Sequence, residues 1–179
     1  MALRAIHLLG SPVLRQCSDK VESVDDEVRT LVQDLFETMH TAEGIGLAAN
    51  QVGLARRIAV VQVGDHPELV LINPEILETE GKEKGEEGCL SIPEIFADID
   101  RAQRIVVETT NLDGERERHE LTDLFARAVQ HEVDHLDGVL FLDHLSPLKR
   151  HMLQKKWKKS RKGQTGYIQE TTAAQASET

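Results

Sequence analysis

Apolar residues recur at helical spacing between residues 23 and 42. The recurring residues are Val28, Leu31, Val32, Leu35, Phe36 and Met39. This spacing places their side chains on one face of an α-helix. Ser23 is a suitable N-cap, and the acidic Asp25 and Asp26 suit the first helical turn. The pattern predicts an amphipathic helix that packs this face against the core.

Three later segments have the composition and alternation of strands. RRIAVVQVG (56–64) and LVLINPEIL (69–77) are rich in Val and Ile. RIVVETTNLDGERERHEL (104–121) contains two such runs around Asn-Leu-Asp-Gly, which is typical of a tight turn. The preceding segment EGIGLAANQVG (43–53) is punctuated by glycine and poor in charge, which predicts a loop.

Two more helices are predicted near the C-terminal end. One extends from Thr122, a good N-cap, to Gly138, because glycine commonly takes the left-handed conformation after a helix. The other is a lysine-rich helical pattern around Trp157. Residues 163–179 are polar and small, so we expect disorder there. With no internal repeat or linker, residues 1–162 are predicted to form one domain.

The chain of 179 residues is long enough to bury a core without disulfides. No N-terminal segment has the basic flank, apolar run and cleavage site of a secretory signal. No stretch approaches the roughly 20 apolar residues that a membrane span needs. We therefore expect a soluble, cytoplasmic protein whose two cysteines, Cys17 and Cys89, are reduced thiols.

Charge is distributed unevenly along the chain. The net charge is -10, yet residues 149–162 hold eight of the 21 Lys and Arg and no Asp or Glu. A polyanionic partner would therefore meet this basic segment first. We expect neither DNA nor a membrane as a partner.

The segment QHEVDHLDG (130–138) presents two histidines on one helical face. His131 and His135 are four residues apart, so both imidazoles can reach one metal ion. Leu124 and Ala128 extend the same face and would supply an apolar surround. Glu132 is rotated by about 100° from His131, so it suits a metal-bound water better than ligation.

A catalytic metal needs a third protein ligand and an open position for water. Cys89 in EEGCLSIP is the strongest candidate, because a loop could bring its thiolate to the helix. The alternative for a lone cysteine is a small buried hydrophobic residue, and this is our interpretation of Cys17. In GIGLAANQ the glycines suit a tight turn, but a turn does not require the polar Gln51.

Three stretches together, GIGLAANQ (44–51), EGCLS (87–91) and QHEVDHLDG (130–138), resemble the three signature motifs of the peptide deformylases. Their order and spacing also match, and the resemblance extends to about residue 150. It implies an α+β fold with antiparallel strands wrapped around a central metal-binding helix. Our own reading adds an N-terminal and a C-terminal helix.

The resemblance implies that the protein removes the N-formyl group from nascent chains that begin with formyl-methionine, releasing formate. The family's metal ligands fall on Cys89, His131 and His135, with water in the fourth position. The family commonly uses Fe(II). A thiolate and imidazole set also suits Zn(II), Ni(II) or Co(II).

In the family mechanism the metal lowers the pKa of the water and Glu132 accepts its proton. The hydroxide attacks the formyl carbon, and Glu132 then returns a proton to the departing amine. By similarity, the Gln51 side-chain amide and the Leu90 backbone N–H stabilise the oxyanion together with the metal.

Further residues match family positions around this centre. Backbone groups that match Ile45, Gly46 and Gly88 bind the peptide as an added strand. Glu87 and Arg101 match an ion pair that supports the cysteine segment. The chain departs from the commonest pattern in two places. Asn50 is expected to affect only the local turn, and Arg127 stands where some members have an apolar pocket residue.

Two other kinds of protein share parts of this pattern. Zinc endopeptidases also contain His-Glu-x-x-His but usually take a third ligand from downstream, where His144 and His151 are the available histidines. A binding module with a closed structural zinc site would use Cys89 and both motif histidines without a function for Glu132.

The basic segment 149–162 has two interpretations. C-terminal helices of some deformylases contact ribosomal RNA near the exit tunnel, which implies ribosome binding here. The alternative is a solvated helix that keeps Met152, Leu153 and Trp157 loosely docked.

Overall fold

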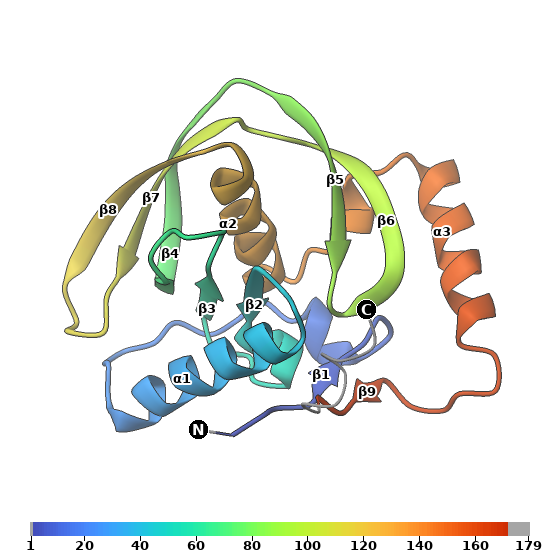
Figure 1. Ribbon diagram of the computed structural model, residues 1–179, viewed down its shortest axis with the longest axis horizontal. Coiled ribbons are helices and arrows are strands. Elements are labelled where there is room, and N and C mark those ends of the chain that lie inside the picture. The colour runs from blue at the N-terminus through green and yellow to red at the C-terminus, as the bar shows by residue number, and fades with distance from the viewer. Residues whose placement is uncertain (1, 172–179) are drawn as a thin grey trace.

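Antiparallel strands wrap around a central helix, α2, in the computed structural model, which describes residues 2–171 (Figure 1). The helices are α1 Asp26–Thr41, α2 Asp123–Leu136 and α3 Pro147–Ser160. Short 3-10 helices are η1 Pro12–Arg15, η2 Ala49–Val52 and η3 Phe141–His144. The strands are β1 Ile6–His7, β2 Gly46–Ala48, β3 Ile58–Val61, β4 Leu69–Glu80, β5 Glu83–Cys89, β6 Ile92–Arg101, β7 Arg104–Thr110, β8 Arg116–Thr122 and β9 Ile168–Gln169. This arrangement confirms the predicted α+β class.

Helix α1 begins three residues later than the first predicted cap. Its N-cap is Asp25, whose carboxylate accepts a hydrogen bond from the Val28 amide at 2.9 Å, so the prediction of Ser23 as cap is wrong. The predicted apolar face is confirmed, since Val28, Leu35 and Met39 are fully buried. The helix therefore covers one face of the larger sheet.

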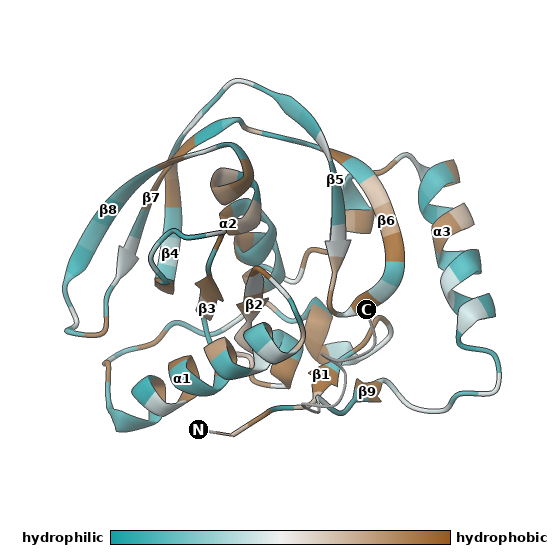
Figure 2. Ribbon diagram, viewed as in Figure 1, coloured by the Kyte–Doolittle hydropathy of each residue, from teal (hydrophilic) through white to brown (hydrophobic). Residues whose placement is uncertain are grey.

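That sheet has five strands in the order β2-β3-β4-β7-β8, and all its neighbours are antiparallel. Strand β3 is buried on both faces. Ile58 and Val60 belong to the apolar cluster under α1, whereas Ala59 and Val61 belong to the cluster around α2. Figure 2 shows β3 as hydrophobic and the edge strand β8 as largely hydrophilic. The sheet thus lies between the two helices.

Strands β5 and β6 pair only with each other and arch over α2 (Figure 1). Ile92, Ile95 and Ile99 of β6 pack in a third apolar cluster with Phe141 and Trp157. The sequence pattern predicted no strand here and expected Cys89 in a loop, but Cys89 ends β5. The loop predicted over residues 43–53 is likewise wrong for β2, because Gly46–Ala48 pairs with β3.

The C-terminal segment is more ordered than its composition predicted. Helix α3 begins at Pro147, capped by the Ser146 hydroxyl, and Trp157 on its inner face is only 7% exposed. Beyond α3, strand β9 pairs with β1, so the prediction of disorder is wrong for Ile168 and Gln169. The rest of that prediction, over residues 172–179, lies outside the described residues. No helix among the described residues is both long and apolar enough to span a membrane.

Candidate metal centre

Three side chains with metal-binding atoms meet where the end of β5 approaches α2. Cys89 Sγ lies 3.2 Å from His135 Nε2, which lies 3.2 Å from His131 Nε2. All three ligand atoms lie within 4.8 Å of one another. A thiolate and two imidazole nitrogens are donors that divalent transition ions prefer, so these residues fit such an ion. Cys17 is exposed, so its interpretation as a buried residue is wrong.

The two histidines sit in different electrostatic environments. Nδ1 of His131 lies 3.0 Å from Glu87 Oε2, which directs Nε2 toward the centre. Burial opposes the charged form of His131, but hydrogen bonding with Cys89 and Glu87 outweighs it and raises the pKa of His131. Burial lowers the pKa of His135, and the positive charge of His131 lowers it further. A neutral His135 has the free nitrogen that ligation needs.

Glu87 joins the centre to a buried charge network. Both oxygens of its carboxylate accept hydrogen bonds from Arg101, at 2.8 and 3.0 Å, so the expected ion pair is present. Burial alone would raise the pKa of Glu87, but hydrogen bonds with His131 and Arg101 hold it well below its usual range. Arg101 also contacts Asp134 at 2.5 Å, and Asp134 contacts His144 at 2.7 Å.

Asp134 and His144 were not predicted to belong to this network. Asp134 lies inside the QHEVDHLDG segment, but its partners are distant in sequence. His144, considered only as a downstream ligand, lies within hydrogen-bonding distance of Asp134, and His151 is exposed on α3. Among the described residues, the metal-binding group contains neither of these histidines. The endopeptidase pattern of a downstream third ligand therefore has no support.

Glu132 lies beside the ligands and is almost fully buried, with 3% of its surface exposed. Gly46 makes room for its carboxylate, since a Cβ at position 46 would lie 2.3 Å from Glu132 Oε1. Oε2 has no hydrogen-bond partner among the described residues. Burial raises the pKa of Glu132 to about 7, and the positive charge of His131 opposes the rise. A carboxylate with this pKa can accept and donate protons at neutral pH.

Gln51 is held in one orientation. Its Oε1 accepts a hydrogen bond from the Ala48 amide at 2.9 Å. Its Nε2 donates to Ser91 Oγ at 3.1 Å and lies 3.6 Å from Cys89 Sγ. The NH₂ end of the amide therefore faces the metal centre. Ser91 lies within the quoted EGCLS motif, but nothing in the sequence pattern assigned it this contact.

Two residues that depart from the commonest family pattern have clear structural partners. Asn50 is fully buried and its Nδ2 donates to the His135 carbonyl at 2.5 Å. It therefore ties η2 to the metal-bearing helix, and the expectation of a purely local effect is wrong. Arg127 is buried and donates to Glu87 at 3.0 Å and to the carbonyls of Ile99 and Glu83, each at 2.8 Å. The hydrogen-bond partners of the Arg127 guanidinium thus all belong to the β5–β6 hairpin.

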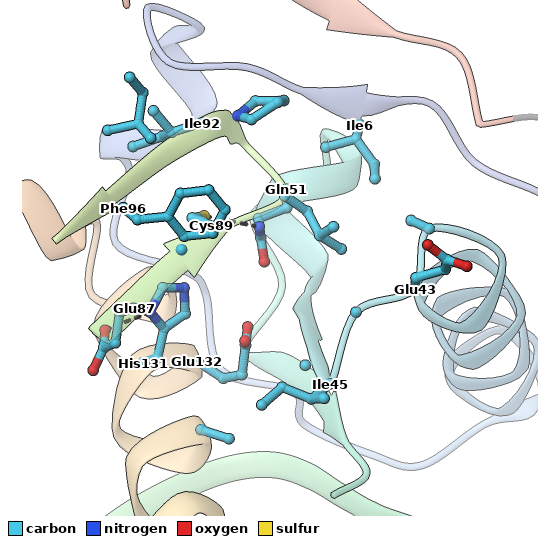
Figure 3. Close-up of a pocket in the computed structure, with 18 of the residues that line it drawn as sticks. Ile6, Glu43, Ile45, Gln51, Glu87, Cys89, Ile92, Phe96, His131 and Glu132 are labelled. Carbon is cyan, nitrogen blue, oxygen red and sulfur yellow. Dashed lines mark hydrogen bonds and ion pairs between the residues drawn. The ribbon is translucent and has the colours of Figure 1, made fainter. Parts of the chain in front are cut away.

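A cavity of about 810 Å³ opens beside these residues (Figure 3). Its lining includes the predicted site residues Ile45, Gly46, Gln51, Glu87, Gly88, Cys89, Leu90, His131 and Glu132. Leu124 and Ala128 of α2 also line it, as their position on the histidine face predicted. Phe96 is 58% exposed and lies directly over Gly88, where a Cβ would approach the ring to 2.6 Å. The cavity is therefore a cleft with apolar walls and a buried carboxylate at its base.

The chain is similar to proteins of one family. The model of the family described as polypeptide deformylase matches residues 3–151. The chain is 51% identical over 146 residues to peptide deformylase 1 of Clostridium acetobutylicum, covering 82% of this chain and 97% of the relative. The crystal structure of the Ehrlichia chaffeensis peptide deformylase in complex with actinonin is 40% identical, with a TM-score of 0.87, and covers 92% of this chain and 100% of that chain. The crystal structure of the Thermotoga maritima peptide deformylase is 44% identical, with a TM-score of 0.79, and covers 82% of this chain and 100% of that chain.

Proposed function

Because the chain belongs to the polypeptide deformylase family, whose members are metal-dependent hydrolases, we propose how its own residues remove the formyl group from N-formyl-methionyl peptides. One observation carries the proposal. Glu132 is buried at the base of the cleft, next to the group formed by Cys89, His131 and His135 but outside it. A carboxylate in that position is suited to proton transfer.

Cys89, His131 and His135 would hold a divalent ion, and Fe(II) is the ion we propose for the cell, with Zn(II), Ni(II) or Co(II) able to replace it. When bound, the ion supplies Lewis acidity, which lowers the pKa of water and polarises the formyl oxygen. Glu87 keeps the His131 imidazole oriented, and Arg101 in turn holds Glu87.

Glu132 takes the proton from the attacking water and passes it to the nitrogen of the departing amine. Its pKa of about 7 supports both transfers, because the carboxylate can accept a proton and then release it at neutral pH. The products are formate and a peptide with a free amino terminus. These two proton transfers need no other acid in the cleft.

Two donors would stabilise the negative oxygen of the tetrahedral intermediate. The NH₂ group of Gln51 faces the centre because Ala48 and Ser91 fix its amide. We propose the Leu90 backbone N–H, next to Cys89 in the cleft lining, as the second donor. Preformed donors of this kind act without reorganisation during the reaction.

The peptide would bind in an extended form between β2 and the end of β5. Strand β2 is at the edge of its sheet, so its outer backbone groups can pair with an added strand. Ile45 and Gly46 on one side and Gly88 on the other offer these backbone groups. The methionine side chain would lie on the apolar face that includes Leu124 and Ala128.

A closed structural zinc site is the competing explanation for the three ligands. It would leave Glu132 buried, without a hydrogen bond to Oε2 and without a function. An unpaired buried carboxylate costs stability, so its presence favours a catalytic site. The cytoplasm, where nascent chains are made, is the location that fits this activity.

The test is formate release from formyl-Met-Ala by the anaerobically prepared, metal-loaded enzyme. Glu132→Gln should keep its metal content and lower kcat by about 10²- to 10⁴-fold, the usual contribution of a general base. The matched control is Glu68→Gln, an exposed glutamate that does not line the cleft, which should keep full activity. Comparable kcat in Glu132→Gln would remove Glu132 from the mechanism.

We further propose that α3 carries the enzyme to the ribosome. Trp157 anchors the helix to the core, while Lys155, Lys156, Lys158 and Lys159 are exposed. Lysine contacts to phosphates release counterions, so binding should weaken steeply with salt. The buried Trp157 makes deletion of residues 149–179 a poor test, because deletion would also disturb the core.

Charge reversal tests ribosome binding without removing the anchor. Changing the four exposed lysines to glutamate should abolish co-sedimentation with ribosomes at low salt and leave formyl-Met-Ala hydrolysis intact. Changing the same four to arginine keeps the charge and should preserve co-sedimentation. If the glutamate variant still co-sediments, α3 is only a solvated helix.

A further inference from the structure

One wall of the cleft lies outside the residues that the family model matches. The match ends at residue 151, yet Gln169 and Thr171 line the same cavity as Gln51 and Glu132. Both belong to residues 167–171, which we call the C-terminal wall. The family model does not cover this part of the cleft.

Backbone pairing with β1 holds the C-terminal wall in place. The antiparallel pairs are Ile6 with Gln169 and His7 with Ile168. The Leu8 amide extends the ladder by donating to the Tyr167 carbonyl at 2.6 Å. Ile6 is itself part of the cleft lining, and in the view of Figure 3 Gln51 lies between Ile6 and Glu132. The wall therefore continues the cleft beyond Gln51.

Side-chain contacts anchor the same segment at its start. Gly10 has a φ of 110°, and a Cβ there would lie 2.3 Å from Cε1 of Tyr167. Gly10 therefore leaves room for the Tyr167 ring, which a side chain at this position would displace. At the end of α3, Arg161 donates to the Gly166 carbonyl at 2.7 Å. The segment is fixed from both the N-terminal and the α3 side.

Alternation along the extended chain separates two faces of the wall. Ile168 and Glu170 are exposed, whereas Gln169 and Thr171 line the cleft. Thr171 is only 8% exposed although its neighbour Glu170 is open to solvent. Gln169 is half-buried in the cleft lining. A polar face with bonding capacity is therefore directed at the cleft.

We propose that the C-terminal wall is a subsite for the peptide residues that follow formyl-methionine, with Gln169 and Thr171 bonding to the peptide backbone. The proposal rests on the deformylase function. An extended peptide advances about 3.3 Å per residue, so we expect the dipeptide to end short of the wall and longer peptides to reach it. Amide and hydroxyl groups both donate and accept hydrogen bonds, so they can bind main chain whatever the peptide sequence.

Peptide length is the variable that tests the subsite. We would measure kcat/KM for formyl-Met-Ala and for formyl-Met followed by two, three or four alanines, with the metal-loaded full chain. The full chain should gain about 3- to 10-fold in kcat/KM through a lower KM as the peptide lengthens, the worth of one hydrogen bond. A chain that ends at Gly163 should lose this gain while its rate on the dipeptide stays within about twofold.

Two controls locate the effect in the wall. A chain that ends at Thr171 keeps the wall and should behave as the full chain does. Gln169→Ala should lose the length-dependent gain, whereas the adjacent, outward-facing Glu170→Ala should keep it. The two substitutions also decide the question if the chain ending at Gly163 fails to fold, because they leave the β1–β9 pairing in place.

Three outcomes would overturn the subsite. The first is that Gln169→Ala keeps the gain in kcat/KM with peptide length. The second is that Glu170→Ala loses this gain as Gln169→Ala does. The third is that longer peptides react faster with the chain that ends at Gly163. Failure of the deformylase function itself is a different result, because the full chain would then release no formate from the dipeptide at all.

Discussion

The close approach of Gly46 determines the position of the Glu132 carboxylate. Gly46 on β2 lies so close to Glu132 on α2 that no side chain fits between them. The glycine also leaves the strand backbone open toward the cleft, where the peptide is proposed to pair. The absence of a side chain at Gly46 therefore leaves room for the Glu132 carboxylate and also leaves the edge of β2 accessible.

Gly46→Ala should lower kcat at least about tenfold at unchanged metal content. The new Cβ would lie 2.3 Å from Oε1, so the carboxylate must move away from its position beside the metal centre. The measurement is steady-state kinetics on formyl-Met-Ala together with metal analysis of the same sample. An unchanged kcat with a raised KM would contradict this reading and place the damage in peptide binding.

Cys89→Ser should weaken metal binding at least about tenfold or change the preferred metal, because a hydroxyl is a poorer ligand than a thiolate. Cys17→Ser is the matched control, since Cys17 is exposed and lies outside the ligand group. Competition with a chelator of known affinity gives the dissociation constants. Equal affinity in the Cys89 variant would exclude it as the third ligand.

Residues that act through a short local pattern can be predicted from the sequence, and those that act through distant partners cannot. The spacing of His131 and His135 indicates a shared face without any structure. Asn50, Ser91 and Asp134 depend on contacts with α2, Gln51 and Arg101, which are formed only in the folded chain. No local pattern reveals them.

At the scale of elements, the predictable helices and strands are those with a strong internal pattern. Helices α1 and α2 and strands β3, β4, β7 and β8 have such patterns. Strand β5 (EKGEEGC) consists almost entirely of polar residues and glycine, and β6 (IPEIFADIDR) lacks a strict alternation of apolar and polar residues. Both are stabilised by pairing with each other over α2. Strand β2 is short and glycine-rich, so its extended form depends on β3.

Two short elements, η1 and η3, are joined by one carboxylate near the end of α2. Asp143 in η3 accepts a hydrogen bond from the Leu140 amide at 2.9 Å and pairs with Arg15 of η1 at 2.5 Å. Burial would raise the pKa of Asp143, but these bonds and the charge of Arg15 lower it. A carboxyl with a lowered folded-state pKa stabilises the protein above its unfolded pKa, and the effect is lost in acid.

Asp143→Asn should therefore lower the free energy of unfolding by about 1 kcal/mol at pH 7, a modest value because the pair is partly exposed. The difference from the unchanged protein should shrink as the pH falls below about 4, where the aspartate becomes protonated. Urea unfolding from pH 7 to pH 3 measures both. A difference that stays constant in acid would show that charge is not the cause.

At the scale of the whole molecule, the metal centre lies where the β5–β6 hairpin meets α2, beside the polar contacts of Glu87 with His131 and Arg127 and of Arg101 with Asp134. Cys89 comes from the two-stranded β5–β6 sheet, and the histidines come from the helix beneath the five-stranded sheet. An ion held by both would act as a cross-link in the folded state. The unfolded chain does not bring these ligands together, so binding adds to stability.

Removal of the metal should lower the melting temperature. An ion at 100 times its dissociation constant contributes about 2.7 kcal/mol, which corresponds to roughly 5–10 °C for a chain of this size. Thermal unfolding with and without a chelator measures the change, and Cys89→Ser should respond less. A melting temperature that does not change in the chelator would mean that the ion does not join the β5–β6 sheet to α2.

The pairing of β1 with β9 affects the order in which the fold can be completed. A polypeptide is made from its N-terminus, so β1 leaves the ribosome among the first residues, while β9 follows only after α3. Until then the edge of β1 lacks the strand with which it pairs in the folded chain. Unpaired edges of this kind join strands of other chains. Synthesis that stalls within α3 would thus leave an aggregation-prone strand at the opposite end of the chain.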